Sequence, residues 1–135
     1  PTEIKATLQA ARAKWLKKKI WLVFQPHQYQ RTFYLWKEFV KTLALIPADR
    51  VILTDIYDVA GRENKQIKKR VSSKKLARAI KNYPVLYIPS LSKAETYLRK
   101  NLRGGEVVII MGAGDIYENL TLRLTRKKER EKINS

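Results

Sequence analysis

The chain has 135 residues, enough for one domain with a single hydrophobic core, and its 29 Lys and Arg against 12 Asp and Glu give a formal net charge of +17. It contains no cysteine, which excludes disulfides and thiolate chemistry and suits a reducing cytoplasm. No apolar run approaches the roughly 18 residues of a membrane span and no signal peptide is visible, so we expect a soluble, cytoplasmic protein.

The first third of the chain predicts a helix, a strand and a second helix. An apolar stripe at helical spacing runs over residues 3–16, and the apolar run 20–25 indicates a buried strand. A second stripe predicts a helix over residues 31–45. The sequence opens on Pro1 without a methionine, which suggests a fragment of a longer protein.

The middle third predicts a strand, a loop, a helix and another strand. Residues 47–50 form a turn before the short apolar strand 51–55. Residues 64–71 are expected to form an exposed, mobile loop. Ser72 or Ser73 then caps a helix, and residues 85–88 form the third strand.

The last third predicts a helix, a strand and a final helix. Ser92 opens a capping box, and Gly104 and Gly105 end that helix. Residues 107–111 are the most continuously apolar run, as expected of a central parallel strand buried on both faces. Asp115 can cap the last helix, so we assign residues 1–124 to the domain and 125–135 to a basic helical extension or disordered tail.

The alternation of helices and strands predicts an α/β fold with a Rossmann-like, mainly parallel sheet and helices on both faces. If the first and fourth strands are neighbours, the loops that follow them face one another, and ligands bind at such a point. His27 and Arg31 would then lie opposite the segment 112–115.

The candidate site residues leave more than one chemistry open. His27 is the only histidine, so a multi-histidine metal site is excluded, and a purely structural hydrogen-bonding role stays open. Arg31, near a helix start, can grip a carboxylate or phosphate bidentately, although it can also be an ordinary surface arginine. No Gly-x-x-x-x-Gly-Lys-Ser/Thr loop exists, so the chain does not cradle a nucleoside triphosphate by itself.

Several motifs together resemble the C-terminal domain of the Mur ligase family. They are PTEI at residues 1–4, QPHxYxRT at 25–32, TDIY at 54–57 and MGAGDI at 111–116. The second of them is typical of the members that join L-alanine to UDP-N-acetylmuramate in peptidoglycan precursor synthesis. The likeness extends to about residue 122.

The resemblance implies a three-domain, ATP-dependent and Mg²⁺-requiring cytoplasmic ligase of which this chain is the third domain. The other domains would hold the UDP-sugar and ATP. The fragment alone would bind neither ATP nor Mg²⁺ and would show no activity. Arg31 would bind the alanine carboxylate, with the remaining substrate-binding and cleft-lining positions being His27, Tyr29, Thr32, Asp55, Tyr57, Gly112, Gly114 and Asp115.

One departure from the family pattern weakens this assignment. The family usually has a second arginine where this sequence has Gln28. Loss of that cation would weaken amino-acid binding by about 1.5–3 kcal/mol unless another basic residue, such as Arg62, compensates.

Two alternatives from other classes remain open at this stage. The charge of +17 is compatible with a basic nucleic-acid-binding α/β module, although the aromatic residues fall mostly on apolar stripes instead of forming a stacking platform. A degenerate interaction domain that kept the fold and lost the site is the other alternative, and Gln28 is its best support. No membrane partner is expected.

Overall fold

The computed structural model describes residues 1–58 and 64–112. Its four strands are β1 (Ile20–Gln25), β2 (Arg50–Leu53), β3 (Val85–Tyr87) and β4 (Val107–Gly112). They form one sheet in the order β3-β2-β1-β4, and every pair is parallel. Ile20 pairs with Val107 and Gln25 with Gly112, so the carboxyl ends of β1 and β4 lie side by side. The predicted α/β class is confirmed, and β1 and β4 are neighbours, which is the condition that the sequence analysis set for the loops after them to face one another.

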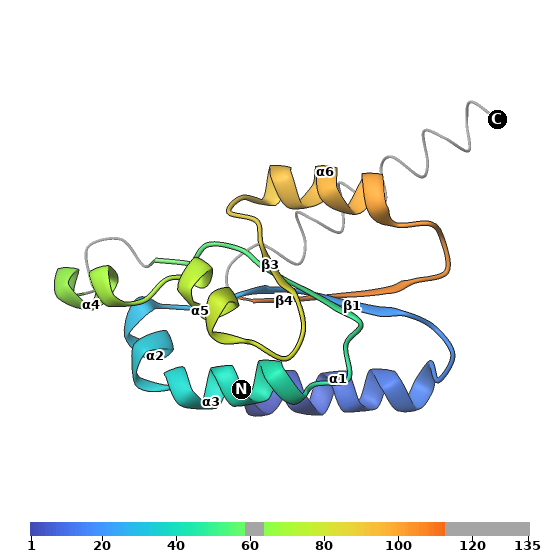
Figure 1. Cartoon of the computed structure of the whole chain (residues 1–135), viewed down its shortest axis with the longest axis horizontal. Helices are drawn as coiled ribbons and strands as arrows, with labels where there is room; N and C mark the ends of the chain where they lie inside the picture. Colours follow the sequence, from blue (N-terminus) through green and yellow to red (C-terminus); the bar gives the residue numbers. More distant parts are fainter. Residues whose placement is uncertain (59–63, 113–135) are drawn as a thin grey trace.

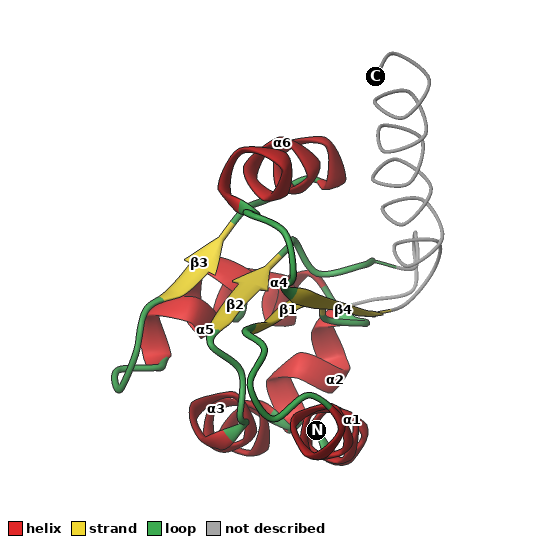
Figure 2. Cartoon of the chain, turned by 90° about the vertical axis from the view of Figure 1, so that its right-hand side faces the viewer, coloured by secondary structure: helices red, strands yellow, loops and turns green. Residues whose placement is uncertain are grey.

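Helices cover both faces of the sheet, as Figure 2 shows. One face carries α1 (Thr2–Lys14), α3 (Trp36–Leu45) and α5 (Ser73–Ala79), and the other carries α6 (Leu91–Asn101). Alternate side chains of β1 enter the two cores: Leu22 packs with Leu8 and Leu43, whereas Val23 packs with Leu98. These five side chains are fully buried, so β1 is the strand around which both hydrophobic layers assemble.

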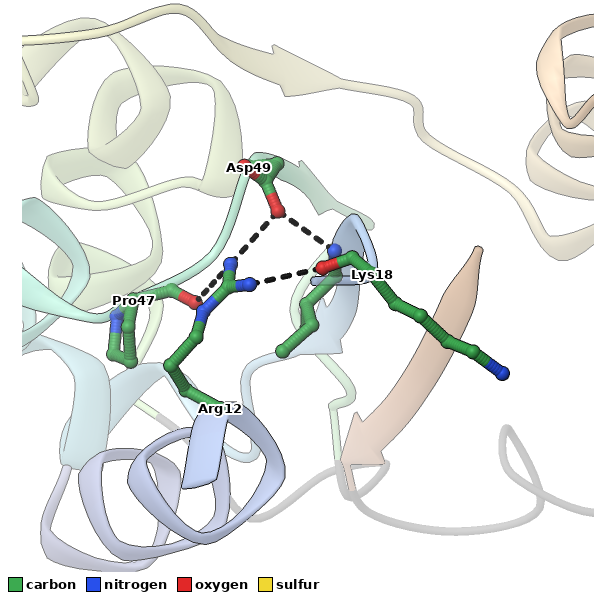
Figure 3. A network of polar contacts seen from close by, with 5 residues as sticks. Arg12, Lys18, Pro47 and Asp49 are labelled. Atoms are coloured by element: carbon green, nitrogen blue, oxygen red, sulfur yellow. Dashed lines mark hydrogen bonds and ion pairs between the residues drawn. The ribbon is translucent and has the colours of Figure 1, made fainter. Parts of the chain in front are cut away.

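A polar network ties the amino ends of the strands to α1, away from the cavity described below (Figure 3). The Arg12 guanidinium donates to the Asp49 carboxylate at 2.8 Å and to the carbonyls of Lys18 and Pro47. The Ile20 N–H donates to the same carboxylate oxygen at 2.7 Å. Burial raises the pKa of Asp49, but the Ile20 N–H and the Arg12 side chain lower it further, and the net pKa is lowered.

Two sequence predictions fail near the start of the site. The helix predicted over 31–45 begins earlier and is split into α2 (Tyr29–Tyr34) and α3, because Leu35 (φ −103°, ψ 19°) leaves helical geometry. The segment 64–71 is not a loop: it contains the short helix α4 (Lys65–Arg70). Asn64 caps α4 by accepting a hydrogen bond from the Gln66 N–H at 2.8 Å, and its interior residues are good helix formers.

Two further predictions need correction. Ser92 is not the N-cap of α6; Ser90 is, because its side chain accepts a hydrogen bond from the Lys93 N–H at 3.2 Å. The strand 107–111 was predicted to be central, but among the described residues β4 lies at the end of the sheet and is only half-buried. The cap at Ser72 is confirmed. The predicted domain end at residue 124 and the helix capped by Asp115 lie outside the described residues.

No helix in residues 1–58 or 64–112 combines the length and apolarity that a membrane crossing requires.

Candidate functional site

A cavity of about 540 Å³ lies where β1 and β4 end. Phe24 and Gln25 of β1 and Met111 and Gly112 of β4 form one side of it, and the start of α1 closes another. Arg31 of α2 and Glu38 of α3 complete the lining, together with His27, Leu35 and Phe39. The lining therefore combines apolar side chains from the strand ends and helices with charged residues.

The loop after β1 is held firmly by the loop after β2. His27 and Tyr57 form an isolated parallel bridge, in which the Gln28 N–H donates to the Tyr57 carbonyl at 2.9 Å and the Tyr57 N–H to the Pro26 carbonyl at 2.8 Å. The rings of His27 and Tyr57 stack obliquely with centroids 5.7 Å apart. These contacts fix the position of His27 at the cavity. The bridge has the same parallel sense as the pairing of β1 with β2 and lies beyond the ends of both strands.

Gln28 has a backbone conformation that side-chain-bearing residues rarely adopt. Its φ is +67° and its ψ is 135°, and it is the one non-glycine residue with positive φ in the described chain. Such a conformation costs about 1–3 kcal/mol and occurs preferentially at functional sites. Here the Thr32 N–H and hydroxyl both donate to the Gln28 carbonyl, at 3.1 and 2.9 Å, and this locks the entry into α2.

Helix α4 supports the same loop from the side (Figure 1). Lys68 forms an ion pair with Asp58, and its Nζ lies 5.6 Å from the centroid of the Tyr29 ring. The ammonium thus links the chain beyond β2 to the first turn of α2, through a charge pair and a cation–π contact. Sequence reasoning missed Lys68 because it treated the segment 64–71 as a loop.

The structure brings only some of the predicted site residues together. His27, Arg31 and Gly112 share the cavity. Tyr57 lies against His27 but is not part of the cavity lining, and Thr32 is fully buried, with its hydroxyl committed to the backbone. Asp55 is exposed and accepts a hydrogen bond from the Tyr87 hydroxyl, which raises the pKa of Tyr87 to about 12.

Tyr29, Gly114 and Asp115 are the remaining predicted site residues. Tyr29 does not line the cavity and contacts Lys68 instead. Gly114 and Asp115, predicted to line the cleft, lie outside the described residues, as does Arg62, the suggested replacement for the family's second arginine. The roles assigned to all these residues remain predictions.

Two carboxylates that the sequence analysis did not single out also line the cavity. Glu38 comes from the first turn of α3 and Glu3 from the first turn of α1. Arg31, Leu35 and Glu38 are spaced at four and three residues, which on an unbroken helix would place them on one face. The break at Leu35 puts Arg31 on α2 and Glu38 on α3, and both still line the cavity. This spacing is the signal that could have found Glu38 from sequence.

The described residues supply no set of metal ligands. Neither residues 1–58 nor residues 64–112 contain a group of three or more His, Asp or Glu side chains that could hold a metal ion. We therefore derive no chemical step through a metal held by these residues.

Comparisons with known proteins settle the family. The family model described as "Mur ligase, glutamate ligase domain" matches residues 1–114 of this chain. The chain belongs to the Mur ligase family. The fold and the motifs at the strand ends agree with this membership.

Curated relatives of this Mur ligase domain share one name, UDP-N-acetylmuramate–L-alanine ligase. The protein from Alkaliphilus metalliredigens is 44% identical over 128 residues, covering 94% of this chain and 26% of the relative. The one from Acetivibrio thermocellus is 42% identical over 118 residues (87% and 24%), and that from Acidithiobacillus ferrooxidans 40% over 116 residues (86% and 24%). This Mur ligase domain therefore spans about a quarter of the length of the relatives it matches.

Proposed function

We propose that this chain is the amino-acid-binding domain of an ATP-dependent UDP-N-acetylmuramate–L-alanine ligase. The observation that carries the proposal is the cavity at the β1 and β4 ends, which is lined by Arg31 and His27 together with apolar side chains. The names of the curated relatives support the choice of L-alanine and UDP-N-acetylmuramate as substrates. A nucleic-acid-binding role is not favoured, because the relatives with this domain are named as ligases.

The proposed reaction joins the alanine nitrogen to the muramoyl carboxyl carbon. ATP, used with Mg²⁺ and held outside this chain, supplies a phosphoryl group that converts the muramoyl carboxylate into an acyl phosphate. The deprotonated amine of L-alanine attacks that carbonyl carbon and the new C–N bond forms. The C–O bond to phosphate then breaks, inorganic phosphate leaves, and the nitrogen loses one further proton to become the amide N–H.

The contribution of this chain is to bind and orient the amino acid. The Arg31 guanidinium takes the α-carboxylate through two parallel N–H···O bonds, which fixes the direction in which the amine points. His27 lines the same cavity and its ring contacts Tyr57, so its imidazole can donate to the same carboxylate or to the substrate carbonyl.

A chimeric enzyme tests the proposal. The chain replaces the matched segment of the Alkaliphilus metalliredigens ligase, and alanine-dependent phosphate release is measured together with the KM values for L-alanine and ATP. We expect Arg31→Met to raise the alanine KM at least about ten-fold, the loss expected for a hydrogen bond to a charged group, with the ATP KM unchanged. Lys41→Met, an exposed substitution on α3 outside the cavity lining, serves as the matched control.

Two results would contradict the proposal. A folded chimera without alanine-dependent phosphate release would refute the domain's role, and an unchanged alanine KM in Arg31→Met would remove Arg31 from the binding site. Circular dichroism of each variant separates these results from misfolding.

A further inference from the structure

Helix α2, which carries Arg31, is too short to be stable by itself. It has six residues, its N-cap residue Gln28 makes no side-chain capping bond, and Thr32 is its one buried residue. A helix of this length forms in water only when tertiary contacts support it. The direction in which Arg31 points therefore depends on the contacts that hold the first turn of α2.

Helix α4 packs against α2 and is equally short (Figure 1). None of its six residues is buried, so the burial of apolar side chains contributes little to its position. The Lys68 side chain joins α4 to the neighbourhood of the cavity. Its ammonium forms an ion pair with Asp58, and its Nζ atom lies 5.6 Å from the centroid of the Tyr29 ring.

Lys68 reaches both of the loops that meet beside the cavity. Asp58 directly follows Tyr57, which is hydrogen-bonded to the loop after β1. Tyr29 precedes Arg31 by two residues within the first turn of α2. The side chains of Lys68 and Asp58 are 32% and 31% exposed, so water screens their attraction only in part. One cation therefore restrains the start of α2 through two contacts.

We propose that Lys68 is a positioning residue, which holds the first turn of α2 so that Arg31 is presented to the cavity. Lys68 is not among the residues that line the cavity, so it acts through Tyr29 and Asp58 and does not contact the substrate. This inference rests on the proposed function, because that function assigns the carboxylate of the amino acid to Arg31. Without the Lys68 cation, α2 keeps its covalent connections but loses a restraint on its orientation.

The same contacts predict a local effect and not a global one. Loss of a partly exposed ion pair together with a cation–π contact shifts a local equilibrium by about three- to ten-fold. Because α4 has no buried residue, its release from α2 exposes little apolar surface. The midpoint of global unfolding should therefore hardly change when Lys68 is replaced.

The first experiment measures substrate binding in the chimera described above. The alanine KM, the ATP KM and kcat are determined for Lys68→Met, for Lys68→Arg and for Lys69→Met, which removes the same charge from an exposed position of α4. We expect Lys68→Met to raise the alanine KM about three- to ten-fold and to change kcat and the ATP KM less than about two-fold, because uniform binding is lost. Lys68→Arg keeps a cation for both contacts and should stay within about two-fold of the unsubstituted chimera.

The second experiment measures the first turn of α2 without reference to activity. The Thr32 N–H donates to the Gln28 carbonyl at 3.1 Å, and hydrogen exchange of peptides spanning residues 28–35 reports on this bond. Lys68→Met should speed this exchange about three- to ten-fold, whereas Lys69→Met should leave it unchanged. Thermal unfolding midpoints of both variants should lie within about 2 °C of the unsubstituted chimera, which separates lost alignment from lost stability.

The outcomes keep this inference apart from the proposed function. If Arg31→Met raises the alanine KM and Lys68→Met does not, Lys68 is not a positioning residue and the proposed function stands. The same conclusion follows if Lys68→Met and Lys69→Met have equal effects, or if Lys68→Met raises the alanine KM without faster exchange in residues 28–35. If Arg31→Met leaves the alanine KM unchanged, the proposed function fails and this inference fails with it.

Discussion

Replacing Arg12 by methionine tests how much the network at the amino ends of the strands stabilises the fold (Figure 3). Methionine keeps an aliphatic stem but removes the guanidinium donors that reach Asp49, Lys18 and Pro47, at 2.8, 2.9 and 3.2 Å, whereas the Ile20 N–H still donates to Asp49. These bonds join α1 to the segments that enter β1 and β2. The expected result is a lower free energy of unfolding.

The loss of stability expected for Arg12→Met depends on how exposed the side chains of Arg12 and Asp49 are. A hydrogen bond to a charged group contributes about 1.5–3 kcal/mol when it is shielded, and an exposed ion pair about 0–1 kcal/mol. The side chain of Arg12 is 29% exposed and that of Asp49 is 43% exposed, so the upper figures do not apply. We expect a loss of about 1–2 kcal/mol for Arg12→Met, which corresponds to a Tm lower by about 3–10 °C in a domain of this size.

Urea unfolding at neutral pH, followed by far-ultraviolet circular dichroism, measures the loss. Lys5→Met, an exposed substitution on α1, is the control and should lie within about 0.5 kcal/mol of wild type. Equal unfolding midpoints for Arg12→Met and Lys5→Met would show that water replaces the network at no cost, and would refute the reasoning.

The pH dependence of the same network has a definite sign. Because the pKa of Asp49 is lowered in the folded chain, its contribution is present above the unfolded pKa of about 4 and is lost as the pH falls through the lower folded value. The difference in stability between wild type and Asp49→Asn should therefore shrink in acid. A difference that persisted well below pH 4 would contradict this assignment.

Two further predictions concern single hydrogen bonds. Ser90→Ala should lower the free energy of unfolding by about 0.5–2 kcal/mol because it removes the N-cap of α6. Ser92→Ala should change it little, since the Thr96 hydroxyl donates to the Ser92 carbonyl, which alanine keeps. Equal losses for the two variants in urea unfolding would contradict the assignment of the cap. Asp55→Asn should shift the pKa of Tyr87 from about 12 back toward 10, because it removes the carboxylate that accepts from the phenol. Phenolate absorbance, taken as the difference from Tyr87→Phe, measures the shift. The stability that this bond contributes should be fully present below the unfolded pKa of about 10 and should be lost as the pH rises from there through about 12.

The strands and the order of the elements followed from local sequence. Apolar runs such as 20–25 and 107–111 have few alternatives to a buried strand, and crossover helices between them require parallel pairing. The sequence placed His27 and Arg31 opposite Gly112 only on the condition that the first and fourth strands are neighbours. The structure meets that condition, and the three residues line one cavity. The net charge, by contrast, did not indicate the function, because it describes solvation and partners in general and not a site.

Details that depend on contacts between distant segments required the tertiary structure. Helix α4 forms in a run of polar helix formers where Lys68 has Asp58 and Tyr29 to bind, and no periodicity in the segment predicts those partners. The positive φ of Gln28 likewise occurs next to the bridge between His27 and Tyr57, and no pattern in the sequence indicates the break at Leu35.

Sequence by itself determined that this chain forms a parallel α/β domain with its polar residues at the strand ends, because hydrophobic periodicity and loop position are properties of short segments. It did not determine that Glu3 and Glu38 share a cavity with Arg31, because that depends on how α1 and α3 pack on one face of the sheet. The sequence gives the charge of each side chain. Opposite charges come together in one cavity only when the helices pack on β1 and β4.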